Sequence, residues 1–437
     1  MKKYIPIVVM LVGMVAATLE KGGMATLTVA FLFPIMTAFL LSDKKKEFGK
    51  TFIDGMQNSM LLTLIGAFLL AGILSQVFTV SGIVPAILWV MSSLHISVLF
   101  VPAFMFGLSL LISFVCGTSA GTITTVMPIF LTLGTEVGMS HGVIVGAIVS
   151  GAVMGNVLSP LSDVVISTAL TTKMSINAVI RENIFLSAGA AITAIVLFTV
   201  WGQRDSGGAA IQLTQTNVDI RALILLILPV IMMVLIKKEW NLISTLLACD
   251  MAGVLINLLL GKITMESLLT EDGILYRGIT GMQSIILYSM ILFWIIEIIK
   301  KEGVFETILR KIVSSCKSKS GAKFMVWLGA VLGVVFTAGG SSGIMVFGPI
   351  ASEVAQRYGI EEGYVTRTFS TVSAGMVSVL PYGTTYILCL GLAKQVGGIQ
   401  LLYKECVPMM IFCDICILMQ LVAAFINKRG EVKNETV

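Results

Sequence analysis

The sequence predicts an all-α polytopic membrane protein made of two inverted-topology repeats, each with a re-entrant hairpin and a broken transmembrane helix. The 437 residues are 57% hydrophobic and only 12% charged, against about a quarter charged in soluble domains. Apolar runs of roughly twenty residues, the length that spans a bilayer, recur along the whole chain. Landmarks of the first half return in the second, and the basic residues segregate by predicted side.

Four landmarks recur in the same order, with offsets between 221 and 226 residues. The matched positions are Pro6 with Pro229, Gly55 with Gly281, Gly117 with Gly339, and Pro160 with Pro381. We therefore predict a first repeat at 1–205, a linker at 206–220 and a second repeat at 221–437. The segment Met1–Leu19 resembles a signal peptide. Because its counterpart lies in mid-chain, we expect residues 4–19 to be a retained helix.

Apolar runs give the same set of parts in each half. The first half is expected to hold helices at 4–19, 24–42 and 57–80, a short segment at 82–92, arms at 97–116 and 121–136, an interrupted helix at 141–172, and a helix at 184–201. The second half is expected to hold helices at 221–236, 240–260 and 280–300, paired arms at 324–358, an interrupted helix at 363–395, and a helix at 406–427.

Each half crosses the membrane five times if the paired arms are re-entrant and seven times if they cross fully. Both numbers are odd, so the second half must be inverted. With the N-terminus inside, 22 of the 29 Lys and Arg residues lie on the cytoplasmic side, as the positive-inside rule requires. The seven on the other side are Lys21, Arg204, Arg221, Lys262, Arg277, Lys394 and Lys404. We predict a multi-pass plasma-membrane protein with both termini cytoplasmic.

Inverted repeats with broken helices are typical of secondary transporters, whose sites lie near the midplane. Non-helical backbone at that depth must be buried or line a cavity. Glycine permits a sharp reversal, and Ser or Thr can cap the next helix. The exposed N–H groups of that helix favour an anion, whereas unwound carbonyls favour a cation. The alternative is close packing of small residues. The candidates at the two glycine clusters are Gly117, Thr118, Ser119, Gly340, Ser341 and Ser342.

The second candidate element is the interruption around Asn156, Ser159 and Asp163. We interpret Ser159 as an N-cap and Pro160 as the first residue of a half-helix, which places Asp163 in its first turn. A carboxylate at membrane depth is a functional candidate, although pairing with the helix dipole is the alternative. We predict that Asp163 binds Na+ or a proton. The matching position is Thr384, followed by Thr385, so the second half contributes hydroxyls and no acid.

Other polar residues in the helices have structural interpretations. Glu297 is expected to form an interfacial ion pair with Lys300 or Lys301, and Arg367 is expected to reach the cytoplasmic surface. The pair Cys413 and Cys416 is expected to pack as small apolar residues. For Asp250 and Asp414, a functional role and a scaffold role both stay open. With only two histidines, His95 and His141, a histidine metal site is not expected.

The stretch from Gly117 to Asp163 resembles the signature of NhaC-type Na+/H+ antiporters, in which GTSWGT precedes SGAxFGDKLSPLSDTT. The resemblance implies a mobile transport unit on a scaffold, often a homodimer, and supports Thr118, Ser119, Ser159 and Asp163 as site residues. Two positions depart from it: Asn156 replaces an Asp and Ala120 replaces a Trp. The missing carboxylate and the smaller side chain leave room for an organic substrate, and relatives move organic acids or amino acids.

We therefore expect a secondary active transporter similar to Na+/H+ antiporters, with Na+ and/or H+ as coupling ion and no other cofactor. The alternative is a Na+- or H+-coupled transporter or exchanger of a small organic acid or amino acid. A channel would need a continuous polar pore, and an enzyme would need a nucleophile with a base or a metal cluster. No basic, aromatic-studded face indicates nucleic acid as a partner.

Overall fold

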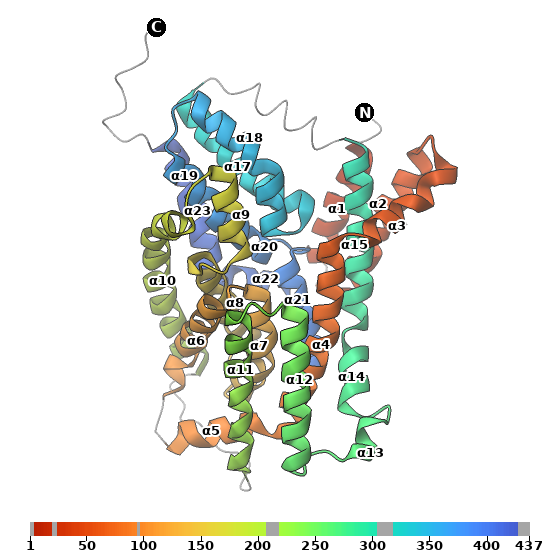
Figure 1. The fold of residues 1–437 in the computed structure, drawn as a ribbon, viewed down its shortest axis with the longest axis vertical. Helices are drawn as coiled ribbons and strands as arrows, with labels where there is room; N and C mark the ends of the chain where they lie inside the picture. Colours follow the sequence, from red (N-terminus) through yellow and green to blue (C-terminus); the bar gives the residue numbers. More distant parts are fainter. Residues whose placement is uncertain (1–3, 20–23, 94–96, 207–217, 304–317, 427–437) are drawn as a thin grey trace.

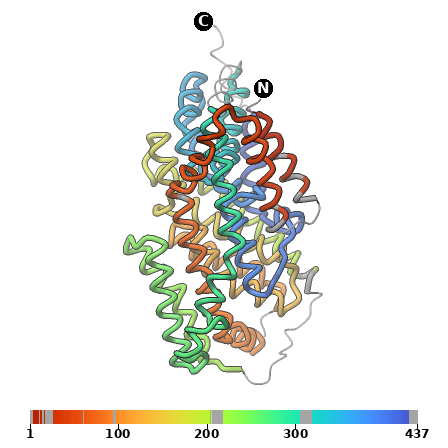
Figure 2. Tube along the Cα trace, turned by 90° about the vertical axis from the view of Figure 1, so that its right-hand side faces the viewer, coloured from red at the N-terminus to blue at the C-terminus, as the bar shows by residue number. Residues whose placement is uncertain are grey.

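The computed structural model describes residues 4–19, 24–93, 97–206, 218–303 and 318–426, and in these ranges all regular structure is helical. Nine of the described helices are long and apolar enough to cross a membrane, or ten if the bent pair Tyr403–Met409 and Ile411–Phe425 counts as one span. Most run along the long axis of the molecule (Figures 1 and 2). The predicted class, an all-α polytopic membrane protein, is confirmed.

The first half contains ten α-helices. They are α1 (Ile5–Leu19), α2 (Met24–Leu41), α3 (Phe48–Met56), α4 (Ser59–Ser81), α5 (Ile83–Ser93), α6 (Val101–Cys116), α7 (Ser119–Glu136), α8 (His141–Leu158), α9 (Asp163–Thr172) and α10 (Ile176–Ser206). Helix α10 begins eight residues before the predicted position 184. Its first turns carry polar residues that an apolar run does not detect, and the Ser175 hydroxyl accepts the Ala178 N–H at 3.3 Å.

The second half repeats this order. Its helices are η4 (Ile220–Leu226), α11 (Ile227–Lys237), α12 (Leu242–Leu259), α13 (Met265–Leu268), α14 (Ile274–Gly281), α15 (Gln283–Lys301), α17 (Lys319–Thr337), α18 (Gly340–Arg357), α19 (Glu362–Arg367), the π-helical turn η5 (Thr368–Val372), α20 (Ser373–Val379), α21 (Thr384–Gly397), α22 (Tyr403–Cys406), η6 (Val407–Met409) and α23 (Ile411–Phe425). Both interrupted helices, α8–α9 and α19–α21, fall where the sequence predicts them. Part of the predicted linker, 207–217, lies outside the described residues.

Matching elements occupy opposite halves of the molecule. Helices α1 and α2 and the hairpin α17–α18 lie in the upper half of Figure 1, whereas α11, α12 and the hairpin α6–α7 lie in the lower half. The halves also exchange contacts, because α9 packs against α18 and α21 packs against α7. This arrangement agrees with inverted repeats. The direction in which each half crosses the membrane stays a prediction.

Two short helices, α3 and α14, are absent from the sequence prediction. They end at the repeated Gly-Met-Gln landmark, where the chain turns into α4 and α15. Helix α3 packs against α15, and α14 packs against α4. The second contact is close: a Cβ on Gly278 would lie 2.7 Å from Ile73 Cα, so this crossing admits only glycine there. The landmark therefore marks a helix break in each half.

Candidate functional site

The tip of the first hairpin depends on Gly117 for two reasons. Its φ of +69° lies in the left-handed region, which glycine enters without steric cost. A Cβ at this position would also lie 2.7 Å from Leu161 Cβ. Thr118 then caps α7 by accepting the Gly121 N–H at 3.4 Å, as predicted. The absence of a side chain at Gly117 thus brings the hairpin tip against the interruption of α8–α9.

The tip of the second hairpin is built differently. Here the left-handed residue is Ala338, with φ +55°, while Gly339 is extended. The expectation that glycine makes both reversals is therefore wrong at this tip. Thr337 compensates locally, because its hydroxyl donates to the Gly339 carbonyl at 2.9 Å and accepts the Gly339 N–H at 3.3 Å. These bonds hold the turn without a left-handed glycine.

The interruption between α8 and α9 is a β-turn. The Ser162 N–H donates to the Ser159 carbonyl at 3.2 Å, with Pro160 at the second position, which it favours. Ser159 is extended, as expected of a residue before proline, and it ends α8. The N-cap of α9 is Ser162, which accepts the Val165 N–H at 3.3 Å. The prediction of Ser159 as N-cap is wrong by three residues because Pro160 belongs to the turn.

This shift makes Asp163 the first residue of α9, and Thr384 is likewise the first residue of α21. The two positions matched by sequence are thus equivalent in structure. The Asp163 carboxylate accepts a hydrogen bond from the Ser341 hydroxyl at the start of α18. A side chain from the first half is therefore linked directly to the hairpin of the second half.

A cavity of about 340 Å³ lies elsewhere, at the far ends of α4 and α7, and a second cavity of about 320 Å³ lies where the helix breaks converge. We call the second the central cavity. Eight of the eleven predicted site residues line it: Thr118, Ser119, Asn156, Asp163, Gly340, Ser341, Thr384 and Thr385. Three do not: Gly117 at the hairpin tip, the buried Ser159 at the end of α8, and Ser342 in the first turn of α18.

The central cavity receives the first turns of six helices, α4, α7, α9, α12, α18 and α21. Free N–H groups make a helix N-terminus equivalent to roughly half a positive charge. Asp163 is the one charged side chain among the described residues that line the cavity. The cavity therefore combines a single fixed carboxylate with several partial positive charges.

Asn156 supplies a polar group that is not fully satisfied. It is 4% exposed and donates to the Ser119 hydroxyl over a long 3.5 Å. Its carbonyl oxygen has no hydrogen-bond partner within the described ranges. Buried polar groups normally have partners. An amide oxygen on the cavity wall therefore provides an acceptor for a bound ligand.

Sequence reasoning missed three hydroxyls on the cavity wall, those of Ser59, Thr63 and Thr124. Ser59 and Thr63 lie on α4, just after the Gly-Met-Gln landmark, which was used only to find the repeat. Thr124 lies one turn beyond Ala120 on α7, and its hydroxyl donates to the Ala120 carbonyl at 2.8 Å. Extending each glycine cluster by one helical turn identifies Thr124.

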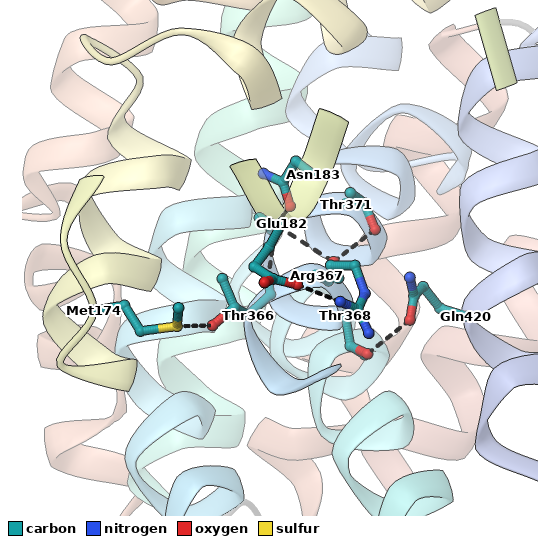
Figure 3. Close-up of polar contacts among 9 residues, drawn as sticks. Met174, Glu182, Asn183, Thr366, Arg367, Thr368, Thr371 and Gln420 are labelled. Atoms are coloured by element: carbon teal, nitrogen blue, oxygen red, sulfur yellow. Dashed lines mark hydrogen bonds and ion pairs between the residues drawn. The ribbon is translucent and has the colours of Figure 1, made fainter. Parts of the chain in front are cut away.

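A polar network joins α10 to the second interrupted helix (Figure 3). Arg367 forms an ion pair with Glu182, a partner that the sequence did not predict, and its reach to the cytoplasmic surface stays a prediction. The Asn183 amide donates to the Val157 carbonyl at 2.9 Å and accepts from Ser370 at 2.7 Å. The Val157 carbonyl lies at the end of α8, where the helix break removes its usual partner. Asn183 therefore ties α8 to the π-helical turn η5.

The remaining predicted roles have mixed outcomes. The ion pair between Glu297 and Lys300 is confirmed at 3.6 Å. Cys413 and Cys416 are free and buried, as small packing residues are expected to be. Asp414 is half-buried in the first turn of α23. Asp250 is buried within α12.

The fold and the cavity together define an integral multi-pass membrane protein whose helix breaks meet at one polar centre. Residues 1–203 and 205–424 match the model of the Na+/H+ antiporter family. The chain therefore belongs to the Na+/H+ antiporter family.

Two more distant similarities were found. The malate-2H(+)/Na(+)-lactate antiporter of Bacillus subtilis (strain 168) is 23% identical over 177 residues. That match covers 40% of this chain and 37% of the relative, so the chain matches less than two fifths of the relative's length. The YdaH transporter of Alcanivorax borkumensis aligns with 88% of this chain and 89% of its own, at 12% identity and a TM-score of 0.40.

Proposed function

We propose that this protein is a secondary active antiporter in which Asp163 binds Na+ or a proton in turn at the central cavity. The observation that carries the proposal is the convergence of Asp163, Asn156 and several hydroxyls from both halves on that one cavity. One carboxylate that takes one cation at a time is the minimum device for coupling two solutes. Family membership supports antiport.

The contact between Asp163 and Ser341 suggests how binding is coupled to movement. The carboxylate belongs to α9 of the first half and the hydroxyl to α18 of the second. A cation that neutralises Asp163 weakens the attraction for the hydroxyl, because a charge-assisted hydrogen bond is roughly twice as strong as a neutral one. The two halves are then free to rock about the site, which is the usual basis of alternating access.

A second candidate function is exchange of a small organic anion, coupled to Na+ or H+. Six helix N-termini at the central cavity favour negative charge. Together they can stabilise more negative charge than the single carboxylate of Asp163 carries. Ala120 leaves space, and about 320 Å³ lies at the lower end of small-molecule sites, which span roughly 300–1,000 Å³. The partial relative is named for malate and lactate. This candidate keeps Asp163 as the coupling site and adds the anion.

The proposed arrangement in the cell follows the charge distribution. We place both termini in the cytoplasm, with the repeats 1–205 and 221–437 oriented oppositely and joined by residues 206–220. Support comes from the segregation of basic residues and from the opposite placement of matching helices (Figure 1). Assembly as a homodimer in the plasma membrane belongs to the same proposal.

The test is a flux assay on the purified full-length protein in liposomes that contain a pH-sensitive dye. An imposed Na+ gradient is expected to drive saturable proton movement. A parallel series adds malate, lactate or an amino acid on either side. Proton movement with Na+ alone supports cation exchange, and strict dependence on an organic solute supports the second candidate. Flux that does not saturate and needs no counter-solute contradicts both candidates and indicates a channel.

A further inference from the structure

Asp250 is a buried carboxyl group that the central cavity does not use. It is the ninth of the 18 residues of α12, a candidate membrane span from Leu242 to Leu259. The residue is 4% exposed. Both of its carboxyl oxygens lack a hydrogen-bond partner in the part of the chain that the structure describes. A group this polar in the middle of a span requires an explanation.

The helices packed against α12 offer Asp250 no countercharge. They are α4, α11 and η4. Helix α4 carries no titratable side chain, α11 carries only Lys237 at its last residue, and η4 carries only Arg221. Arg221 is held by Asp219 at 2.9 Å. The adjacent Cys249 carries a thiol, which provides no countercharge and donates to the Leu228 carbonyl at 3.8 Å.

An ionised carboxylate here would be both buried and unpaired, the arrangement that proteins avoid by neutralising the group. The neutral acid has a much smaller desolvation penalty. The described surroundings of Asp250 therefore fit a carboxylic acid that holds its proton in this conformation.

The position of Asp250 connects it with both cavities. Leu242 lines the central cavity and lies two turns before Asp250 on α12, a rise of about 12 Å. Asn257 lies two turns beyond Asp250 and donates to the Val77 carbonyl at 3.1 Å. The residue after Val77, Phe78, lines the other cavity, of about 340 Å³, at the far ends of α4, α7 and α21. Asp250 thus lies on α12 between Leu242 at the central cavity and Asn257, whose partner on α4 adjoins the 340 Å³ cavity.

Other buried polar atoms without hydrogen-bond partners lie on α12 and on the neighbouring helix α4. Within the described ranges they include the Thr245 hydroxyl before Asp250, the Asn257 carbonyl oxygen after it, and the Ser75 hydroxyl on α4. All are fully buried. Such atoms are rare in a tightly packed scaffold, and they supply acceptors for water if α4 and α12 separate.

We propose that Asp250 is a second proton-binding site, separate from Asp163, which holds a proton while α4 and α12 are closed and releases it when they part. In release, the carboxyl O–H bond breaks, the proton passes to water entering from a cavity, and a carboxylate remains. Rebinding reverses the step. The inference of proton binding depends only on the surroundings of Asp250. The inference that this binding is coupled to transport rests on the proposed antiport function.

Infrared spectroscopy of the purified full-length protein tests proton binding directly. A protonated carboxylic acid has its own carbonyl stretch, which shifts in heavy water. The wild-type minus Asp250→Asn difference spectrum is expected to contain this band, and Asp250→Glu is expected to retain it. Glu297→Gln is the matched control, since its ion-paired carboxylate contributes no such band. Thermal unfolding verifies that each variant is folded. A folded Asp250→Asn variant with an unchanged carbonyl region overturns the proposal.

Flux assays then separate this proposal from the proposed function. Asp250→Asn is expected to keep solute exchange but to move fewer protons per solute and to lose part of its pH dependence. A pH profile and proton count equal to wild type overturn the coupling. Asp163→Asn tests the antiport function separately: if that variant exchanges solutes normally, the function assigned to Asp163 fails, while the infrared result for Asp250 still stands.

Discussion

The interrupted helices of the two halves break at corresponding positions and differ in chemistry. In the first, α8 ends, a turn follows, and α9 begins with Asp163; in the second, α20 ends, a turn follows, and α21 begins with Thr384. Both residues line the central cavity. Repetition thus sets where a side chain lies, while the individual residue sets whether it carries charge. A coupling ion therefore has one carboxylate, and the second half supplies hydroxyls around it.

The hairpin tips differ in the same way. Gly117 is left-handed and lies against the α8–α9 turn, whereas Ala338 is left-handed and is held by the hydroxyl of Thr337. The first tip has no room for a side chain. The second accepts one at the cost of backbone strain.

The largest effect is expected from Asp163→Asn. Asp163 is exposed, and losing a hydrogen bond to a charged group costs about 1.5–3 kcal/mol, which corresponds to roughly 10- to 100-fold in binding. Cation-coupled exchange in liposomes should fall by about that factor. Thermal unfolding and gel filtration should match wild type, because the side chain lines a cavity. Full exchange by the variant would remove Asp163 from the proposed mechanism.

The next effect tests whether the halves are interchangeable. We expect Asp163→Thr combined with Thr384→Asp to stay at least about tenfold below wild type in exchange, a difference of about 1.4 kcal/mol. The carboxylate at the second position would lie on α21, which packs against α7, where Ser119 already interacts with Asn156. Recovery of wild-type exchange would show that a carboxylate at the matching position of either half can bind the ion, whatever its local partners are.

The hairpin comparison predicts opposite sensitivities. Gly117→Ala should destabilise the protein by about 2–4 kcal/mol, from left-handed backbone strain of about 1 kcal/mol and overpacking of about 1–3 kcal/mol. Ala338→Gly relieves a similar strain but gains freedom in the unfolded chain, so a change below about 1 kcal/mol is expected. Apparent melting temperatures in detergent measure both. Equal losses would mean that the two tips are equivalent.

A smaller effect than that of Gly117→Ala is expected at the Arg367–Glu182 ion pair. Its side chains are 30% and 25% exposed, so solvent screens the pair, and a coupling of about 1 kcal/mol is expected. A double-mutant cycle with Arg367→Gln and Glu182→Gln, read as thermal stability, measures it. High salt should weaken the coupling. A value of zero would show that the ion pair does not help to hold α10 against α19.

Local sequence signals predicted much of the fold because membrane helices are long and apolar and each break contains glycine or proline. The interrupted helices and hairpins appear where they were expected. Short helices with mixed polarity, α3 and α14, gave no apolar run and were missed. The N-cap was predicted at Ser159 because the following Pro160 is favourable both in a turn and at the start of a helix. The sequence alone does not distinguish these two roles.

Sequence by itself determined the membrane class and the residue types at the helix breaks, because hydropathy and composition are properties of the chain. It also predicted the repeat, from the spacing of the landmarks. Tertiary structure decided which breaks meet. It brought Asp163 to Ser341, 178 residues away, placed hydroxyls of α4 and α7 on the same cavity, and left Asp250 without a partner in the described region. These outcomes depend on packing between distant helices, which no local pattern encodes.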